Sequence, residues 1–152
     1  MKKALITGSF DPPTKGHLDL IKKCAKLFEE TVVLVSVNSG KTYMFPLEKR
    51  LEMLRAMCAG ISGITVDHFD GLVGEYAGKN GIDVIVKGAR NGSDFEYETM
   101  LDRVNKTVCS INTIIIPSAP EYEHISSTSA REMIIHGGNK DAFLPEEVIR
   151  LI

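Results

Sequence analysis

The sequence predicts an α/β fold in which about five parallel strands form a doubly wound sheet with helices on both faces. Short apolar runs alternate with amphipathic segments of about 10–15 residues along the whole chain. The clearest run, TVVLVSV at 31–37, is β-branched and uninterrupted, as expected of a parallel strand covered on both faces. A length of 152 residues, 43% of them hydrophobic, is enough for one domain with a substantial core. We therefore expect a single Rossmann-like domain over residues 1–152.

The first half of the chain predicts two strands and two helices. A short strand at 4–6 is followed by a helix at 16–28, which is expected from apolar residues at helical spacing: Leu18, Ile21, Ala25 and Phe28. The strand at 31–37 comes next. Pro46 suits the first turn of a second helix, which Gly60 ends. The apolar stripe of that helix is Leu47, Leu51, Leu54 and Cys58.

The second half continues the alternation of strands and helices. The expected strands are 64–66, 83–86 and 113–116, and the expected helices are 72–78, 94–108, 126–135 and 144–152. Gly74 weakens the first of these helices, and Pro117 closes the last strand. Ser129 and Glu132 have the spacing of a capping box at the start of the helix at 126–135.

Charge and composition exclude several classes of protein. The chain carries 18 basic and 20 acidic residues, so its net charge of −2 gives no basic field for binding nucleic acid or an anionic membrane. No apolar stretch approaches the roughly 18 residues of a membrane span. Cys24, Cys58 and Cys109 match no metal-ligand spacing and are assigned to packing. We expect a cytoplasmic protein with reduced thiols and no metal ion held by its side chains.

The loop after the first strand, GSFDPPTKGH at 8–17, has the composition of a phosphate-binding site. Ligands of doubly wound sheets bind beyond the carboxyl ends of the strands, and a helix N-terminus favours a phosphate there. His17 would lie in the first helical turn, where with Ser9 and Thr14 it would stabilise charge on a phosphorus under attack. A phosphate nucleophile is mostly ionised at neutral pH and needs no general base. Taken alone, His17 is better explained as a surface helix residue beside ordinary turn residues, but the whole ten-residue segment after the first strand favours a phosphate site.

Two later loops carry candidate anion contacts. Lys41, after the strand at 31–37, is either an anion contact or a solvated surface group. Lys87 and Arg90 flank Gly88 after the strand at 83–86. At the end of a strand, these two cations would bind a triphosphate from one side.

Two helix starts carry further candidates. Glu98 either accepts a hydrogen bond from adenine or ribose, or compensates a helix dipole. In HISSTSAR at 124–131, N-capping explains one hydroxyl and leaves others for a second phosphate site.

Three motifs resemble those of a known group of enzymes. GSFDPPTKGH is similar to the (T/H)xGH signature of the nucleotidyltransferase superfamily, with Thr14 and His17 at its ends. HISSTSARE at 124–132 resembles the second motif of that superfamily, ISSxxxR/K. KGARNGSDFEYE at 87–98 resembles the RGxRxxxDFEYE segment of bacterial phosphopantetheine adenylyltransferases. The resemblance extends over nearly the whole chain and makes residues 1–152 a nucleotidyltransferase domain.

The resemblance implies a reaction and a set of ligands. Members of this family transfer the adenylyl group of Mg²⁺-bound ATP to 4′-phosphopantetheine by in-line attack, giving dephospho-coenzyme A and pyrophosphate. A homohexamer and feedback by coenzyme A are also implied. His17 would be the catalytic residue that stabilises the transition state. The phosphopantetheine side would be formed by Ser9, Lys41, Val73 and Lys87. The ATP side would be formed by Ser9, Phe10, His17, Gly88, Ala89, Arg90, Glu98, Tyr122, Glu123, His124, Ile125, Ser126, Ser127 and Thr128.

The sequence leaves other functions open. Lys87 stands where the family usually has arginine, so the charge is kept but a bidentate fork is lost. ISST followed by Arg131 is also the form seen in nicotinate-nucleotide adenylyltransferases. The alternatives are adenylyl transfer to nicotinate mononucleotide, cytidylyl transfer to a phosphorylated alcohol, and a non-catalytic nucleotide-binding module. A dehydrogenase is not supported, because no G-x-G-x-x-G follows the first strand.

Overall fold

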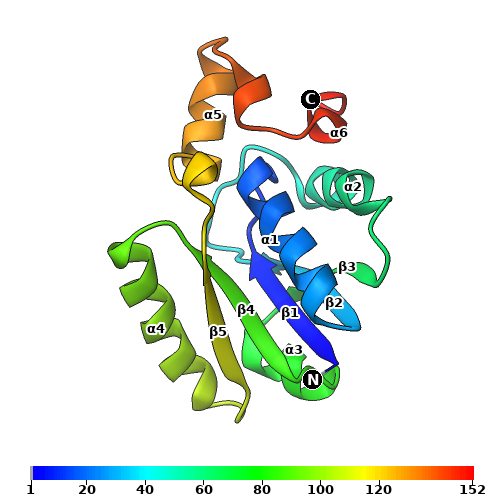
Figure 1. Ribbon diagram of the computed structural model, residues 1–152, viewed down its shortest axis with the longest axis vertical. Helices are drawn as coiled ribbons and strands as arrows, with labels where there is room; N and C mark the ends of the chain where they lie inside the picture. Colours follow the sequence, from blue (N-terminus) through cyan, green and yellow to red (C-terminus); the bar gives the residue numbers. More distant parts are fainter. Residues whose placement is uncertain (1) are drawn as a thin grey trace.

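The five expected strands are all present and form one parallel sheet (Figure 1). The computed structural model describes residues 2–152, and Met1, the first residue of the expected domain, lies outside them. The strands are β1 (Lys3–Gly8), β2 (Glu30–Val37), β3 (Ile64–Asp70), β4 (Val84–Ala89) and β5 (Asn112–Pro117). Their order across the sheet is β3-β2-β1-β4-β5, and every neighbouring pair is parallel. The predicted fold class, a Rossmann-like doubly wound sheet, is confirmed.

The order of the strands reverses at β1. From β1 the chain moves outward on one side through β2 to β3. It then returns to pair β4 with the other edge of β1, where Ala4 lies opposite Val84 and Ile6 lies opposite Val86. In doubly wound sheets the loops that follow two such strands diverge and leave a crevice at their carboxyl ends. The ends of β1 and β4 are therefore the expected place for a ligand.

Helices cover both faces of the sheet. They are α1 (Lys15–Leu27), α2 (Leu47–Cys58), α3 (Val73–Lys79), α4 (Gly92–Lys106), α5 (Ser127–Ile135) and α6 (Glu146–Ile149), with 3₁₀ turns η1 (Pro120–Tyr122) and η2 (Lys140–Ala142). Buried residues of α1, α2, α5 and α6 form one apolar cluster with the sheet, and those of α3 form a second cluster. Figure 1 shows α5 and α6 beyond the carboxyl-end edge of the sheet, above α1.

Alternation along the strands explains the two clusters. On β1, Ala4 and Ile6 belong to the cluster of α1 and α2, whereas Leu5 between them belongs to the cluster of α3. β2 and β4 alternate in the same way. Because successive side chains point to opposite faces and both faces are covered, each central strand has an uninterrupted apolar stretch. This packing accounts for the uninterrupted run that predicted β2.

All five strands are longer than predicted, and β3 and β4 extend furthest beyond their predicted carboxyl ends. β4 continues through Lys87 and Gly88 to Ala89, because β5 pairs with it that far and Ala89 lies opposite Pro117. Lys87 and Gly88 were expected in a loop after the strand, and that expectation is wrong. β3 likewise runs on to Asp70, beyond the predicted 64–66, because β2 pairs with it over this length.

Several helix ends also differ from prediction. α4 begins at Gly92 rather than 94, because the Asn91 side chain caps it and accepts a hydrogen bond from the Asp94 N–H. The capping box of α5 joins Ser126 to Ser129, not Ser129 to Glu132, because the helix begins directly after Ser126. The predicted helix at 144–152 is reduced to α6, and beyond Arg150 the chain makes only the i→i−3 hydrogen bonds of turns.

The three cysteines are free thiols. Cys24 and Cys58 are buried in the core, and burial raises the pKa of each thiol to about 11. Both side chains therefore pack as small uncharged groups. Within residues 2–152, no helix combines the length and the apolar character that crossing a bilayer requires.

Candidate active site

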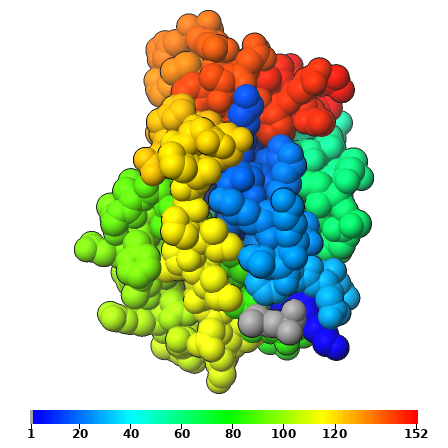
Figure 2. All heavy atoms as spheres, viewed as in Figure 1, coloured from blue at the N-terminus to red at the C-terminus, as the bar shows by residue number. Residues whose placement is uncertain are grey.

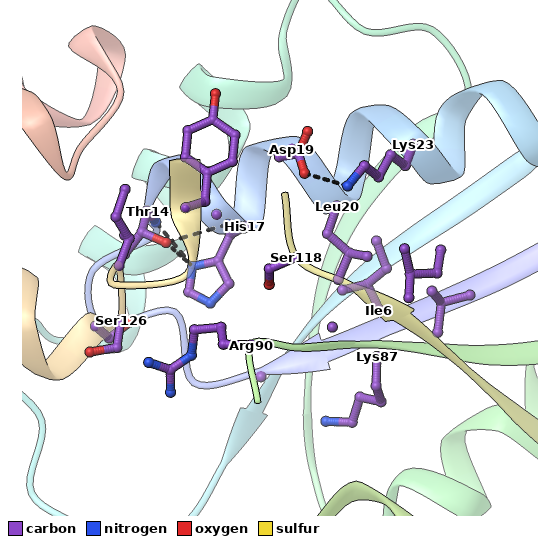
Figure 3. Close-up of a pocket in the computed structure, with 18 of the residues that line it drawn as sticks. Ile6, Thr14, His17, Asp19, Leu20, Lys23, Lys87, Arg90, Ser118 and Ser126 are labelled. Carbon is purple, nitrogen blue, oxygen red and sulfur yellow. Dashed lines mark hydrogen bonds and ion pairs between the residues drawn. The ribbon is translucent and has the colours of Figure 1, made fainter. Parts of the chain in front are cut away.

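A pocket lies at the reversal point, between the carboxyl ends of β1 and β4 (Figure 3). Its walls come from the loop after β1, the start of α1, the end of β4, the segment after β5 and the start of α5. The segment after β5 lies directly against α1 in Figure 2, yellow beside blue. Of the predicted site residues, the pocket is lined by Phe10, His17, Lys87, Gly88, Arg90, Glu98, Tyr122, Ile125, Ser126 and Ser127. Segments far apart in the sequence are thus brought to one place.

His17 is held by a reciprocal cap at the start of α1. The Thr14 side chain accepts a hydrogen bond from the His17 N–H at 3.3 Å, and the Thr14 N–H donates to His17 Nδ1 at 3.0 Å. A backbone N–H can only donate, so Nδ1 must accept. The neutral ring therefore carries its proton on Nε2. A structural cap thus fixes both the orientation and the tautomer of the imidazole.

The surroundings of His17 keep the ring uncharged. Burial, with a smaller contribution from the nearby charges of Lys87 and Arg90, lowers its pKa to about 4. The ring also packs edge-on against Phe10, with 4.8 Å between the ring centroids. These surroundings make His17 a neutral hydrogen-bond donor at physiological pH.

Phe10 owes its place to an unusual backbone conformation. Its φ is +49°, in the left-handed region that bulky residues rarely adopt, and its side chain is almost fully buried. The ring lies directly over Gly8, where an added Cβ would be 3.4 Å from it, in ordinary van der Waals contact. The left-handed turn thereby directs the aromatic ring against His17.

Lys87 and Glu98 meet inside the pocket. Lys87 Nζ lies 3.4 Å from a Glu98 carboxylate oxygen and also 3.4 Å from the Thr7 carbonyl, and both charged side chains are largely shielded from solvent. Glu98 was expected to contact adenine or ribose, or to compensate a helix dipole. The structure places it in the pocket wall beside Lys87, where it would compete with a phosphate for the ammonium group.

Arg90 follows β4 and is oriented by α4. Its Nε lies 3.1 Å from the Asp94 carboxylate, which also accepts the Arg90 N–H. Figure 3 shows His17, Arg90 and Lys87 gathered around one space. An imidazole N–H, a guanidinium and an ammonium group therefore face a common volume, which suits a polyphosphate.

The serine cluster mainly builds the start of α5. Ser126 and Ser129 cap each other: the Ser129 N–H donates to Ser126 Oγ at 3.0 Å, and the Ser126 N–H donates to Ser129 Oγ at 2.9 Å. Ser127 Oγ donates to the Pro12 carbonyl at 2.9 Å. Capping and docking onto the β1–α1 loop thus use hydroxyls that the sequence left for a second phosphate site.

Seven predicted site residues do not line this pocket. Lys41 is exposed in the loop after β2, and Val73 begins α3 and packs on the cluster of that helix. The other five adjoin lining residues along the chain: Ser9, Ala89, Glu123, His124 and Thr128. The pocket seen here therefore unites the expected ATP residues better than the expected phosphopantetheine residues.

Sequence reasoning missed several polar residues around the site. Asp19 and Lys23 form an ion pair of 2.7 Å on α1 and line the pocket, as does Ser118. Asp11 and Arg50 are charged yet buried. Asp11 lies within the recognised first motif, so its position was a usable signal. Arg50 gives no such signal, because a charge beside a helical apolar stripe is normally solvated.

The fold and the polar pocket define a nucleotidyltransferase-like protein. The model of the cytidylyltransferase-like family matches residues 5–133. The phosphopantetheine adenylyltransferase of Arthrobacter sp. (strain FB24) is 40% identical over 151 residues, which cover 99% of this chain and 95% of that protein. The enzyme of the same name from Caldanaerobacter subterraneus subsp. tengcongensis is 41% identical over 149 residues, 97% of this chain and 93% of that protein. The chain belongs to the phosphopantetheine adenylyltransferase family.

A solved structure supports the fold alone. Thermotoga maritima TmcAL, bound with alpha-thio ATP, is similar with a TM-score of 0.73 at 13% identity. The match covers 99% of this chain and 55% of that one, so this chain spans about half of the larger protein.

We predict that His17 titrates far below an ordinary histidine. Histidine-selective NMR, assigned with His17→Gln, should give a pKa of about 4, and Mg-ATP should raise it because phosphates offset Lys87 and Arg90. Since the folded pKa lies below the unfolded value near 6.5, the unfolded chain binds more protons at acidic pH. Stability should therefore be unaffected above about pH 6.5 and fall by up to about 3 kcal/mol towards pH 4. A His17 pKa near 6.5 in the folded protein would contradict this picture.

Proposed function

We propose that this chain transfers the adenylyl group of ATP to 4′-phosphopantetheine and releases dephospho-coenzyme A and pyrophosphate. The observation that carries the proposal is the pocket in which His17 Nε2–H, Lys87 and Arg90 face one volume at the strand-reversal point. Its composition suits a polyphosphate, and the family relationship supplies the acceptor. The pocket contains no activated serine or cysteine, and the reaction needs none.

The transfer needs positioning and charge stabilisation rather than a base. An oxygen of the acceptor phosphate bonds to the α-phosphorus of ATP while the bond from that phosphorus to the pyrophosphate oxygen breaks. Negative charge spreads over the oxygens of the α-phosphorus and the leaving pyrophosphate. His17 Nε2–H donates to this charge, and Lys87 and Arg90 balance it electrostatically. The acceptor phosphate is already mostly ionised near neutral pH.

Magnesium enters this proposal as part of the substrate Mg-ATP. Among residues 2–152 there is no group of three or more histidine, cysteine, aspartate or glutamate side chains placed to hold a metal ion. The two carboxylates that line the pocket, Asp19 and Glu98, are each paired with a lysine. The ion would therefore be held mainly by the phosphates, whose charge it would partly neutralise.

The remaining site assignments follow from the motifs and are part of the proposal. The residues from Tyr122 to Thr128 would enclose ATP from the α5 side, supported by Tyr122, Ile125, Ser126 and Ser127 in the pocket wall. Lys87 would serve the acceptor phosphate. Lys41 and Val73 would contact the rest of phosphopantetheine outside the pocket wall.

The choice of acceptor is tested by pyrophosphate release from Mg-ATP. We expect release with 4′-phosphopantetheine and none with nicotinate mononucleotide, with dephospho-coenzyme A identified by mass spectrometry. Release only with the nucleotide would overturn the acceptor and keep the chemistry. If folded protein binds ATP but releases nothing with either acceptor, the non-catalytic module becomes the better explanation.

Removing the His17 ring should slow chemistry without unfolding the protein. We predict that His17→Ala lowers kcat by roughly 10²–10³, the cost of deleting one donor to a developing oxyanion. Steady-state kinetics would be compared with His136→Ala, which removes an exposed histidine at the end of α5. Wild-type turnover in His17→Ala would remove the residue from the mechanism.

We also propose a homohexamer in the cytoplasm, with coenzyme A as a feedback ligand because it contains the adenylyl and pantetheine parts of the product. Support for assembly comes from α4, which has no buried residue and exposes about half of each of three apolar side chains on one face: Tyr97, Met100 and Val104. An apolar helix face of this kind is typical of a surface that another chain covers.

A charge on α4 should therefore disrupt the assembly. We expect light scattering to give a hexameric mass for wild type and a smaller mass for Val104→Glu, with the fold retained because α4 contributes no buried side chain. Leu27→Glu, at an exposed position on α1, is the matched control and should leave the mass unchanged. A monomeric wild type, or a hexameric Val104→Glu, would reject α4 as the contact.

A further inference from the structure

Two charged side chains are buried outside the pocket wall. Asp11 and Arg50 are 4% and 2% exposed and are the only charged residues buried within 2–152. Neither lines the pocket. Burying a charge is costly unless hydrogen bonds compensate it, so the partners of these side chains show what they hold in place.

The main partners of both side chains are backbone groups of two loops. Asp11 Oδ2 accepts the Met44 N–H at 2.8 Å, and Asp11 Oδ1 accepts the Phe45 N–H at 2.9 Å. Arg50 Nε donates to the Phe45 carbonyl at 3.0 Å, and its Nη1 donates to the Ser9 carbonyl at 2.8 Å. The loop after β2 is therefore tied to the loop after β1, with Phe45 held on its N–H and on its carbonyl.

Asp11 and Arg50 together form an anchor between the two loops, and two further contacts reinforce it. The Arg50 guanidinium lies 4.0 Å from the centroid of the Tyr43 ring, so it also stacks on the loop that it anchors. From the other side, Arg131 of α5 donates to the Asp11 carbonyl at 2.8 Å. Segments after β1 and β2 and the helix α5 thus converge on Asp11 and Arg50.

The anchor acts directly on the peptide beside His17. Because a trans peptide is planar, fixing the Ser9 carbonyl towards Arg50 turns the Phe10 N–H in the opposite direction. That N–H has no hydrogen-bond acceptor among residues 2–152, and Phe10 lines the pocket. The ring of Phe10 then packs on His17. Arg50 thereby orients the Phe10 N–H and the packing of the Phe10 ring on His17, at the catalytic end of the pocket.

We propose that Asp11 and Arg50 are positioning residues that lock the β2–α2 loop, which carries Lys41, to the phosphate-binding loop that carries Ser9 and Phe10. The anchor transmits the position of the acceptor-side loop to the catalytic loop without contacting either substrate. The kinetic part of this inference rests on the proposed function. Its structural part does not, and the two are tested separately.

The test uses Arg50→Lys and Asp11→Asn in the full chain. Lysine keeps the positive charge but cannot donate to two separate carbonyls from a planar fork. Asparagine has one acceptor oxygen in place of two, so the Met44 or Phe45 N–H loses its partner. Arg55→Lys is the matched control, since Arg55 is an exposed arginine on the same helix.

Three readouts separate positioning from simple loss of stability. Thermal unfolding establishes that each variant is folded at the assay temperature. Hydrogen exchange followed by mass spectrometry reports on peptides covering 9–14 and 38–46 without any substrate. Steady-state kinetics with Mg-ATP and 4′-phosphopantetheine give kcat and both KM values.

In both variants we expect faster exchange in the two loops and a kcat lowered by about 10–100-fold, the effect of a small misplacement of reacting groups. Arg55→Lys should match wild type in every readout. Wild-type exchange in both loops would overturn the anchor. Faster exchange with wild-type kcat and KM would show that the anchor is only structural. If wild type itself does not turn over phosphopantetheine, the proposed function fails, and the exchange data still decide the anchor.

Discussion

The reversal of strand order at β1 is the constraint on which the rest of the molecule depends. Because β2 and β4 pair with opposite edges of β1, the loops leaving β1 and β4 face each other across one crevice. One side supplies a helix start with its capping residue and imidazole, and the other supplies Lys87 and Arg90. A polyphosphate in this crevice would be reached from two directions by groups that lie about 70 residues apart in sequence, an arrangement that a single phosphate-binding loop does not provide.

Charge within the crevice is arranged so that two cations coexist with a histidine that donates a hydrogen bond without carrying a charge. An imidazolium beside Lys87 and Arg90 would be repelled, and burial disfavours it further, which is why the pKa of His17 falls to about 4. The Thr14 N–H decides which nitrogen keeps the proton, because it occupies Nδ1. Glu98 and Asp94 hold the two cations in place, so the site is organised by contacts within the protein.

Local sequence patterns predicted the fold well. They did not predict features that depend on pairing between distant segments. The β-branched run of β2 and the helical spacing of α1 identified those elements because each is decided by neighbours in sequence. β4 was predicted too short, because its last residues are held in the sheet only by β5. The motifs located His17, Lys87 and Arg90, but the pairing of Lys87 with Glu98 depends on the packing of α4 against β4. Arg50 was missed because only the folded loops reveal its contacts with the Phe45 and Ser9 carbonyls and with the Tyr43 ring.

The two buried charges follow from the nature of the loops that bear the site. Backbone groups in a loop cannot pair along a strand, yet they need partners once they are shielded from water. Asp11 satisfies two successive N–H groups and Arg50 satisfies carbonyls from two loops, which an apolar side chain cannot do. Arg50 has no carboxylate partner within residues 2–152, so its charge is balanced by carbonyl dipoles and the Tyr43 ring. The contacts that make burial tolerable are the same contacts that fix the Ser9–Phe10 peptide beside His17. In this part of the fold, the same contacts therefore determine both the stability of the loops and the geometry of the site.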